Sequence, residues 1–298
     1  MAENDKTTVA ERAKELLTEP RHRIAFDDFV NEHLRVALDR LSAQHFPLSG
    51  NLTNEDLVKR LAAYDNAVRD LLDIVILTGR WGDAEGRNQL EKILSRLIET
   101  IPSAGGLTVL LHLRWYPLAV LIYAAGIAAL SGQRFDVLNA VFTPLVQVEP
   151  HPTSQALVNA VMSPLVEIDQ NFKVIPGRGR DRFPRSEHLL AILREPLDRL
   201  LFLGGSFEPL FDRFEVLLAL AFADLRDPKG EGDVWGPFGR FVYKQRRSNS
   251  PINTLIEEAT AAGSSWPLLA SGLFGGQSAR FLRVAETFRQ LINRNATG

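Results

Sequence analysis

The sequence predicts an all-α protein in which antiparallel helical hairpins stack as an irregular α-solenoid or a multi-helix bundle. Apolar residues recur at spacings of three and four through most of the 298 residues, which is typical of helices with one buried face. Sustained alternation of apolar and polar residues, which would indicate strands, is nearly absent. In addition, residues 115–130 are apolar on every side, as in a helix that other helices enclose.

The first hundred residues predict four helices. Prolines, glycines or capping residues bound the segments that carry helical spacing, which are 7–19, 26–44, 53–77 and 86–101. Thr53 and Asp56 have the spacing of a capping box, with Asp in place of the usual Glu. The third segment is expected to run as one long helix to Leu77, before Gly79.

The uncharged run at residues 115–133 raises a choice between a membrane span and a buried core helix. A span needs about 20 mostly apolar residues to cross roughly 30 Å of hydrocarbon. The apolar part, residues 115–130, rises only about 24 Å at 1.5 Å per residue. Pro117 stands near the first turn, where its missing N–H is not needed. We therefore expect the core helix of a soluble protein and no membrane partner.

Residues 119–150 predict a helical hairpin. The second helix carries one apolar stripe, and Pro150 closes the segment; the stripe consists of Phe135, Leu138, Phe142 and Leu145. Residues 153–172 continue in helical spacing, with a kink or break expected at Pro164.

The hairpin at 119–150 resembles one tetratricopeptide-type repeat. Tyr123 and Gly126 lie in the first helix and Gly132 in the turn, and the spacing from Leu138 to Phe142 and the closing proline matches that family's small residue, aromatic residue and terminal proline. Leu138 stands where the family favours Ala, the turn is one residue longer, and no second copy follows at a 34-residue period. The resemblance covers about a tenth of the chain and implies a stacked helix pair without a specific function. An ordinary amphipathic hairpin of a bundle is an equal alternative.

A loop rich in Gly, Pro and Arg at residues 173–185 is the predicted boundary between two helical subdomains, 1–172 and 173–298. The first subdomain carries 16 Lys and Arg against 22 Asp and Glu, a net charge of −6, and the second carries 18 against 14, a net charge of +4. This asymmetry suits docking of one subdomain on the other, or an anionic partner on the second.

The sequence of the second subdomain predicts helices at 186–203 and 207–227, joined by a Gly-Gly-Ser turn. Residues 228–251 are expected to be irregular, with 239–245 as a candidate short strand, and helical spacing returns from 252 to 295. Phe274 lies between glycines and either fills an apolar pocket or projects as an anchor for a partner.

The sequence lacks the patterns that are typical of several kinds of functional site. Cysteine is absent, which excludes disulfides, thiolate metal sites and cysteine nucleophiles. The six histidines are dispersed without an HExxH pattern, and the glycine-rich stretches lack the Lys-Ser/Thr of a P-loop. We therefore expect no metal, no cofactor and no catalytic set. The acidic, polar N-terminus does not resemble a signal peptide, so we expect a cytoplasmic protein.

Two basic groups are the candidate contacts for phosphates or for another anionic partner. Aromatic residues interleave with them, as in sites that combine phosphate contacts with base stacking. The basic residues are Lys173, Arg178, Arg180, Arg182, Arg185, Lys244, Arg246 and Arg247, and the aromatic residues are Phe183, Phe241 and Tyr243. Alternatively, these side chains are solvated or pair with the acidic first subdomain.

Two carboxylate pairs share a helix face: Asp212 with Glu215, and Asp70 with Asp73. Such a pair supports acid–base chemistry when it is buried, because one carboxyl is then held protonated. Neighbouring arginines favour the simpler expectation of ordinary exposed helix charges.

These observations favour a non-catalytic helical module that binds a protein partner or acts as a scaffold in a cytoplasmic complex. The inference from a helical stack to protein binding is an analogy, because a fold does not fix a function. One alternative is a regulator that contacts nucleic-acid phosphates through its arginine-rich loops. Another is a helical enzyme with an unrecognised site that depends on Asp212 or Glu215. The sequence predicts no oligomeric state.

Overall fold

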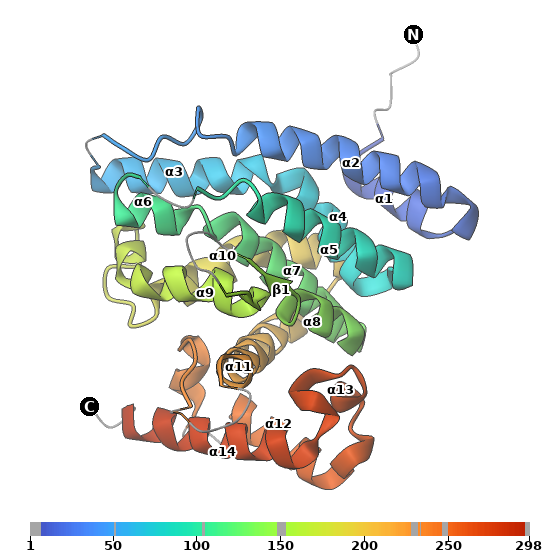
Figure 1. The fold of residues 1–298 in the computed structure, drawn as a ribbon, viewed down its shortest axis with the longest axis vertical. Helices are drawn as coiled ribbons and strands as arrows, with labels where there is room; N and C mark the ends of the chain where they lie inside the picture. Colours follow the sequence, from blue (N-terminus) through green and yellow to red (C-terminus); the bar gives the residue numbers. More distant parts are fainter. Residues whose placement is uncertain are drawn as a thin grey trace.

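A computed structural model describes residues 7–50, 52–102, 105–147, 153–227, 232, 234–245 and 250–295. Within these ranges the regular secondary structure is helical apart from one pair of two-residue strands, which confirms the predicted all-α class (Figure 1). The α-helices are α1 (Val9–Leu17), α2 (Arg23–Arg40), α3 (Asn54–Ala67), α4 (Arg69–Trp81), α5 (Ala84–Ile98), α6 (Thr108–Leu113), α7 (Tyr116–Ser131), α8 (Phe135–Phe142), α9 (Leu157–Glu167), α10 (Pro184–Leu201), α11 (Phe207–Arg226), α12 (Pro251–Ala262), α13 (Pro267–Ala270) and α14 (Ser278–Asn295). The 3-10 turns are η1 (Pro20–His22), η2 (Asp169–Val174), η3 (Gly204–Ser206), η4 (Arg240–Lys244), η5 (Gly263–Ser265) and η6 (Leu273–Gly276).

Helix α7 is the centre of the molecule, and every residue from Tyr116 to Leu130 is buried. Helices α3, α4, α5, α8, α9, α10 and α11 all pack against it. The segment Thr108–Ser131 is long and apolar enough to cross a membrane, with a mean hydropathy of 1.5, but its most apolar window is fully buried inside the protein. The expectation of a buried core helix is therefore confirmed for the fold.

Glycines set how closely the neighbours approach α7. A Cβ on Gly126 would overlap the ring of Phe214 in α11, and a Cβ on Gly79 of α4 would lie 2.7 Å from the Ala125 carbonyl oxygen. Gly79 therefore lies inside α4, where it permits close packing, and does not end a helix as expected.

The expected single helix at 53–77 is two helices. The predicted capping box of Thr53 and Asp56 is present and begins α3, but α3 ends at Ala67. Val68 has φ −103° and ψ 7°, outside the helical region, and α4 begins at Arg69. Both α3 and α4 pack against α7, and apolar spacing alone does not reveal the break between them.

Helices α7 and α8 form the predicted hairpin, but α8 is shorter than expected. It ends at Phe142, and Leu145 lies exposed in β1 (Leu145–Val146), which pairs antiparallel with β2 (Gln155–Ala156). Pro144 has no N–H to donate to the preceding turn and so opposes continuation of the helix. Pro150, the proline of the tetratricopeptide-type pattern, lies outside the described residues.

The structure also tests the expectations for Pro164 and for the candidate strand at 239–245. Pro164 lies inside α9, which continues to Glu167 without ending there. The candidate strand at 239–245 is wrong, because residues Arg240–Lys244 form η4, a 3-10 turn that packs on α11.

The described core is continuous across the loop at 173–185. Buried side chains from both sides of it belong to one hydrophobic cluster, and α10 contacts both α4 and α7. Helices α12 and α14 pack against the other side of α11, at the C-terminal end of the molecule (Figure 1). The division into two subdomains stays a prediction.

Candidate functional site

An apolar recess lies where the last turns of α1, α4 and α10 meet. It encloses about 550 Å³ and is lined mainly by apolar side chains: Leu17, Trp81, Leu200, Leu201 and Phe202, with Thr18 and Lys14. Because α1 and α10 both pack against α4, the three helix ends present one shared surface. Lys14 is the single charged residue in this lining.

Phe202 combines exposure with backbone strain. Its side chain is 86% exposed, the largest value among the large apolar residues described. Its backbone is left-handed, with φ 56° and ψ 44°, and its N–H ends α10 by donating to the Asp198 carbonyl at 2.8 Å. Glycine or asparagine usually occupies this position, because the left-handed conformation costs other residues about 1–2 kcal/mol. Phe202 is therefore unfavourable for folding in two ways: its apolar side chain is exposed, and its backbone conformation is strained.

Trp81 forms a second exposed wall of the recess. It is the last residue of α4 and is 51% exposed. The guanidinium of Arg80 lies 5.7 Å from the Trp81 ring centre, and Arg80 Nη1 donates to the Ser131 carbonyl at 2.6 Å. This hydrogen bond links the end of α4 to the end of α7 and so holds the helix end that carries Trp81 in place.

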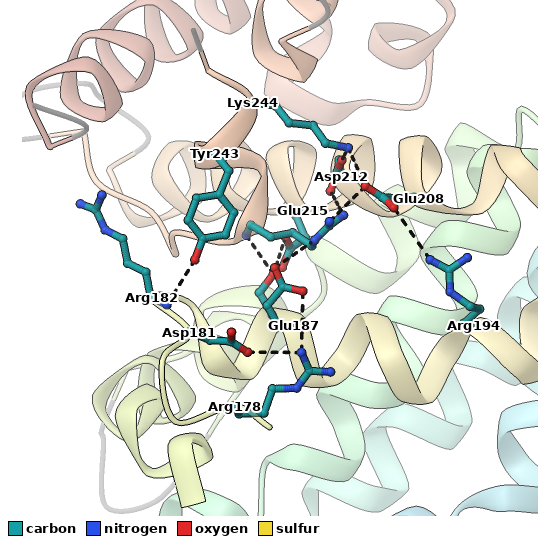
Figure 2. A network of polar contacts seen from close by, with 12 residues as sticks. Arg178, Asp181, Arg182, Glu187, Arg194, Glu208, Asp212, Glu215, Tyr243 and Lys244 are labelled. Atoms are coloured by element: carbon teal, nitrogen blue, oxygen red, sulfur yellow. Dashed lines mark hydrogen bonds and ion pairs between the residues drawn. The ribbon is translucent and has the colours of Figure 1, made fainter. Parts of the chain in front are cut away.

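A second feature is a buried polar network between α10, α11 and η4 (Figure 2). Glu208, Asp212 and Glu215 lie four and three residues apart and therefore share one face of α11. Arg240 donates to Asp212 Oδ1 and Glu208 Oε1, at 3.0 Å in each case. Lys244 donates to the same two carboxylates, at 2.9 Å to Glu208. These pairs fasten η4 onto α11.

Glu215 is a buried carboxylate of this network, at 2% exposure. Ser186 Oγ donates to its Oε2 at 2.8 Å, and the Tyr123 hydroxyl donates to its Oε1 at 3.1 Å. Gly239 approaches so closely that a Cβ there would overlap the carboxylate. Burial raises the pKa of Glu215 to about 7, although the hydrogen bond from Ser186 and the charge of Arg185 oppose that rise.

A separate buried chain links Asp65, Tyr116 and His188. The Tyr116 hydroxyl donates to Asp65 Oδ1 at 2.7 Å and lies 2.8 Å from His188 Nε2. Burial raises the pKa of Asp65 to about 6 and lowers the pKa of His188 to about 4. At neutral pH His188 is therefore uncharged. The hydrogen bonds between these three side chains join α3, α7 and α10 without a buried cation.

The structure divides the predicted basic contacts into two sets. Three of them form ion pairs inside the protein: Arg185 with Asp169, Arg178 with Asp181 and Glu187, and Lys244 with Glu208 and Asp212. Lys173, Arg180 and Arg182 are exposed, while Arg246 and Arg247 lie outside the described residues. Most of the internal partners belong to the same half of the chain, so the pairing is not mainly with the acidic first subdomain.

The two basic segments nevertheless meet in space. The backbone N–H of Arg182 donates to the Tyr243 hydroxyl at 3.2 Å (Figure 2). The rings of Phe183 and Tyr243 lie 5.3 Å apart. Tyr243 is exposed, so one aromatic ring is accessible beside the exposed basic residues.

The expectation that Asp212 and Glu215 are ordinary exposed charges is wrong. Both are buried, and Arg213, their neighbour in sequence, turns away to pair with Glu258 at 2.6 Å. Asp70 and Asp73 also have separate partners, because Asp73 accepts from Arg199 at 2.6 Å and Asp70 lies 3.5 Å from His33. The cations that engage Asp212 come from η4, a segment that helical spacing does not relate to α11.

The recess and its two aromatic residues were not among the expected site residues. The apolar run 200–203, which includes Phe202, stands directly before Gly204 and Gly205, and this is a detectable sign of a helix end that carries apolar residues. In the described part of the chain, no three His, Asp or Glu side chains converge as a metal ion would require. No family model, curated protein or solved structure matches the chain.

Proposed function

We propose that the protein is a cytoplasmic, non-catalytic binding module that docks a partner protein in the recess between α1, α4 and α10. The observation that carries the proposal is Phe202, which is strained and 86% exposed beside an apolar hollow of about 550 Å³. Exposed apolar patches of this kind are typical of interaction sites, and aromatic anchors commonly dominate the binding energy.

The lining indicates what kind of segment would fit. Its leucines and aromatic rings suit two or three apolar side chains of an amphipathic segment. Lys14 is the one charge in the lining, so an acidic residue next to those anchors would complement it. The proposed partner is therefore an amphipathic acidic segment of another protein.

The test compares three variants of the full chain. Phe202→Asn and Lys14→Glu alter the recess, and Leu145→Asn removes another exposed apolar side chain, on β1 and outside the recess lining. Proteins retained by the wild-type chain are purified and titrated individually against each variant. For the partner, we expect Phe202→Asn to weaken the Kd at least about tenfold and Lys14→Glu to weaken it less, with Leu145→Asn unchanged.

Two results would overturn the proposal. One is a purified partner that binds Phe202→Asn as tightly as the wild-type chain. The other is a wild-type dimer in analytical ultracentrifugation that Phe202→Asn dissociates, because the occupant would then be a second copy of this chain.

A second candidate function is nucleic-acid binding at the joined basic segments. The contact between Arg182 and Tyr243 favours it, because it places an exposed ring beside exposed basic residues. Phosphate contacts would make the affinity for single-stranded RNA fall steeply with salt, and Lys173→Ala with Arg180→Ala would reduce that slope. An unchanged slope argues against this candidate. The enzyme alternative gains no support, because Asp212 and Glu215 are buried and hydrogen-bonded to internal partners.

A further inference from the structure

A second cavity lies on a different part of the molecule, between α8, α11, α14 and the turn that contains η6. It encloses about 250 Å³. Its lining combines polar and apolar groups: Asn139, Thr143, Asp224, Arg280, Leu225 and Phe274. The proposed docking recess uses none of these residues, so the two sites are independent.

Arg280 is held in one orientation by Asp224. Its Nε donates to Asp224 Oδ1 at 2.5 Å and its Nη2 donates to Oδ2 at 2.9 Å. Asp224 is buried, and this side-on pair uses only one edge of the guanidinium. The other edge, which carries Nη1, keeps the fork of donors that matches a carboxylate. Nη1 has no hydrogen-bond partner among the described residues.

Asn139 supplies a second unused donor. Its Oδ1 accepts from the Thr143 hydroxyl at 3.0 Å, which fixes the amide and leaves Nδ2 as the free end. Nδ2 likewise has no acceptor within the described part of the chain. It would lie 3.2 Å from a Cβ on Gly272, and Arg280 Nη1 would lie 3.3 Å from a Cβ on Gly275. The two glycines therefore leave space beside both donors.

The turn that forms this wall is strained. Phe274 has φ 55° and ψ 28°, and Gly272, Gly275 and Gly276 also have positive φ. A phenylalanine adopts this conformation rarely, whereas the three glycines adopt it without strain. The Phe274 side chain is 3% exposed and packs edge-on against Phe281, with ring centres 5.0 Å apart. It gives the cavity a rigid aromatic wall.

We infer that this cavity binds a small monocarboxylate with a short apolar tail, held by Arg280 and Asn139. The carboxylate accepts from Nη1 and Nδ2, and the tail lies against Leu225 and Phe274. The small volume restricts the ligand to a few carbon atoms beyond the carboxylate.

Butyrate is the probe, and its uncharged isostere butyramide is the matched control ligand. Butyrate is titrated into the ¹⁵N-labelled full chain, and the shifts of the Arg280 and Asn139 side-chain signals are followed. We expect saturable shifts with a Kd of about 1 mM and at least tenfold weaker binding of butyramide. Asn139→Asp replaces the donor with an acceptor and should weaken butyrate at least tenfold. Asn253→Asp on α12, outside the cavity, should leave the affinity unchanged.

Three results would overturn the inference: no saturable shift with butyrate, equal binding of butyramide, or unchanged binding by Asn139→Asp. Arg280→Lys tests the second donor, because it keeps a cation beside Asp224 but loses the fork, and butyrate binding that survives it would also contradict the assignment. None of these outcomes depends on the docking recess.

Discussion

Phe202 and Phe274 have the same left-handed backbone, with φ 56° and 55°, but opposite surroundings. Phe274 is buried and packs against Phe281, so contacts inside the chain offset its strain. Phe202 is exposed, and its strain has no comparable offset within the described residues. Backbone strain that is offset by packing inside the protein needs no explanation beyond folding. Backbone strain without such an offset indicates that the residue has a role outside the fold.

Charged groups show the same contrast. Asp212 and Glu215 lose hydration on burial but gain hydrogen bonds from η4, α7 and α10. Lys14, in the lining of the recess, has no ion pair among the described residues. The two buried carboxylates between α10, α11 and η4 thus have internal hydrogen-bond partners, while the recess is apolar and exposed.

Removal of Phe274 should produce one of the largest losses of stability. Phe274→Ala deletes a buried ring and leaves a cavity against Phe281, which costs about 3–5 kcal/mol. Urea denaturation would measure it as a lower free energy of unfolding. A loss below about 1 kcal/mol would mean that packing does not offset the strain of this turn.

Removal of Asp212 should have a comparable effect for an electrostatic reason. Asp212→Ala leaves Arg240 and Lys244 with fewer carboxylates in a partly buried place, and breaking a buried ion pair costs about 3–5 kcal/mol. Glu55→Ala is the control, because Glu55 pairs with Lys59 in an exposed i, i+4 bridge worth about 0.3–0.5 kcal/mol. If urea denaturation gave similar losses of unfolding free energy for the two variants, the buried network would not stabilise the protein more than an exposed ion pair does.

Glu215 should make stability depend on pH in a specific direction. Its pKa is about 7 in the folded protein against an ordinary value of 4.5, so the folded state binds the proton more tightly than the unfolded state. The resulting stabilisation is present below pH 4.5 and is lost as pH rises through 7, by about 3 kcal/mol.

Glu215→Gln isolates this contribution from other groups. Asp65 has a raised pKa and acts in the same direction, whereas the lowered pKa of His188 favours folding at higher pH. The difference in unfolding free energy between Glu215→Gln and the wild-type chain should therefore shift in favour of the variant between pH 4.5 and 7.5. A pH-independent difference would show that Glu215 stays ionised throughout.

The sequence was sufficient for the fold class and for the buried position of residues 115–130, because both follow from apolar spacing. It did not reveal the break at Val68 or the role of Gly79, since each depends on how α4 meets α7. Burial of Asp212 and Glu215 was also missed, because their partners come from other elements: Asp212 binds cations of η4, and Glu215 accepts from Ser186 in α10 and Tyr123 in α7. The recess arises from three helix ends that no local pattern relates to one another.

The unfolding free energy of Phe202→Asn tests most directly whether Phe202 serves a partner and not the fold. Asparagine tolerates the left-handed backbone, and little packing is lost, so the variant should be about 0.5–1 kcal/mol more stable than the wild-type chain. Phe202→Ala, which removes the ring but keeps the strain, should stay close to the wild-type value. A loss of 1 kcal/mol or more in Phe202→Asn would show that the fold needs this ring, and the contrast with Phe274 would be wrong.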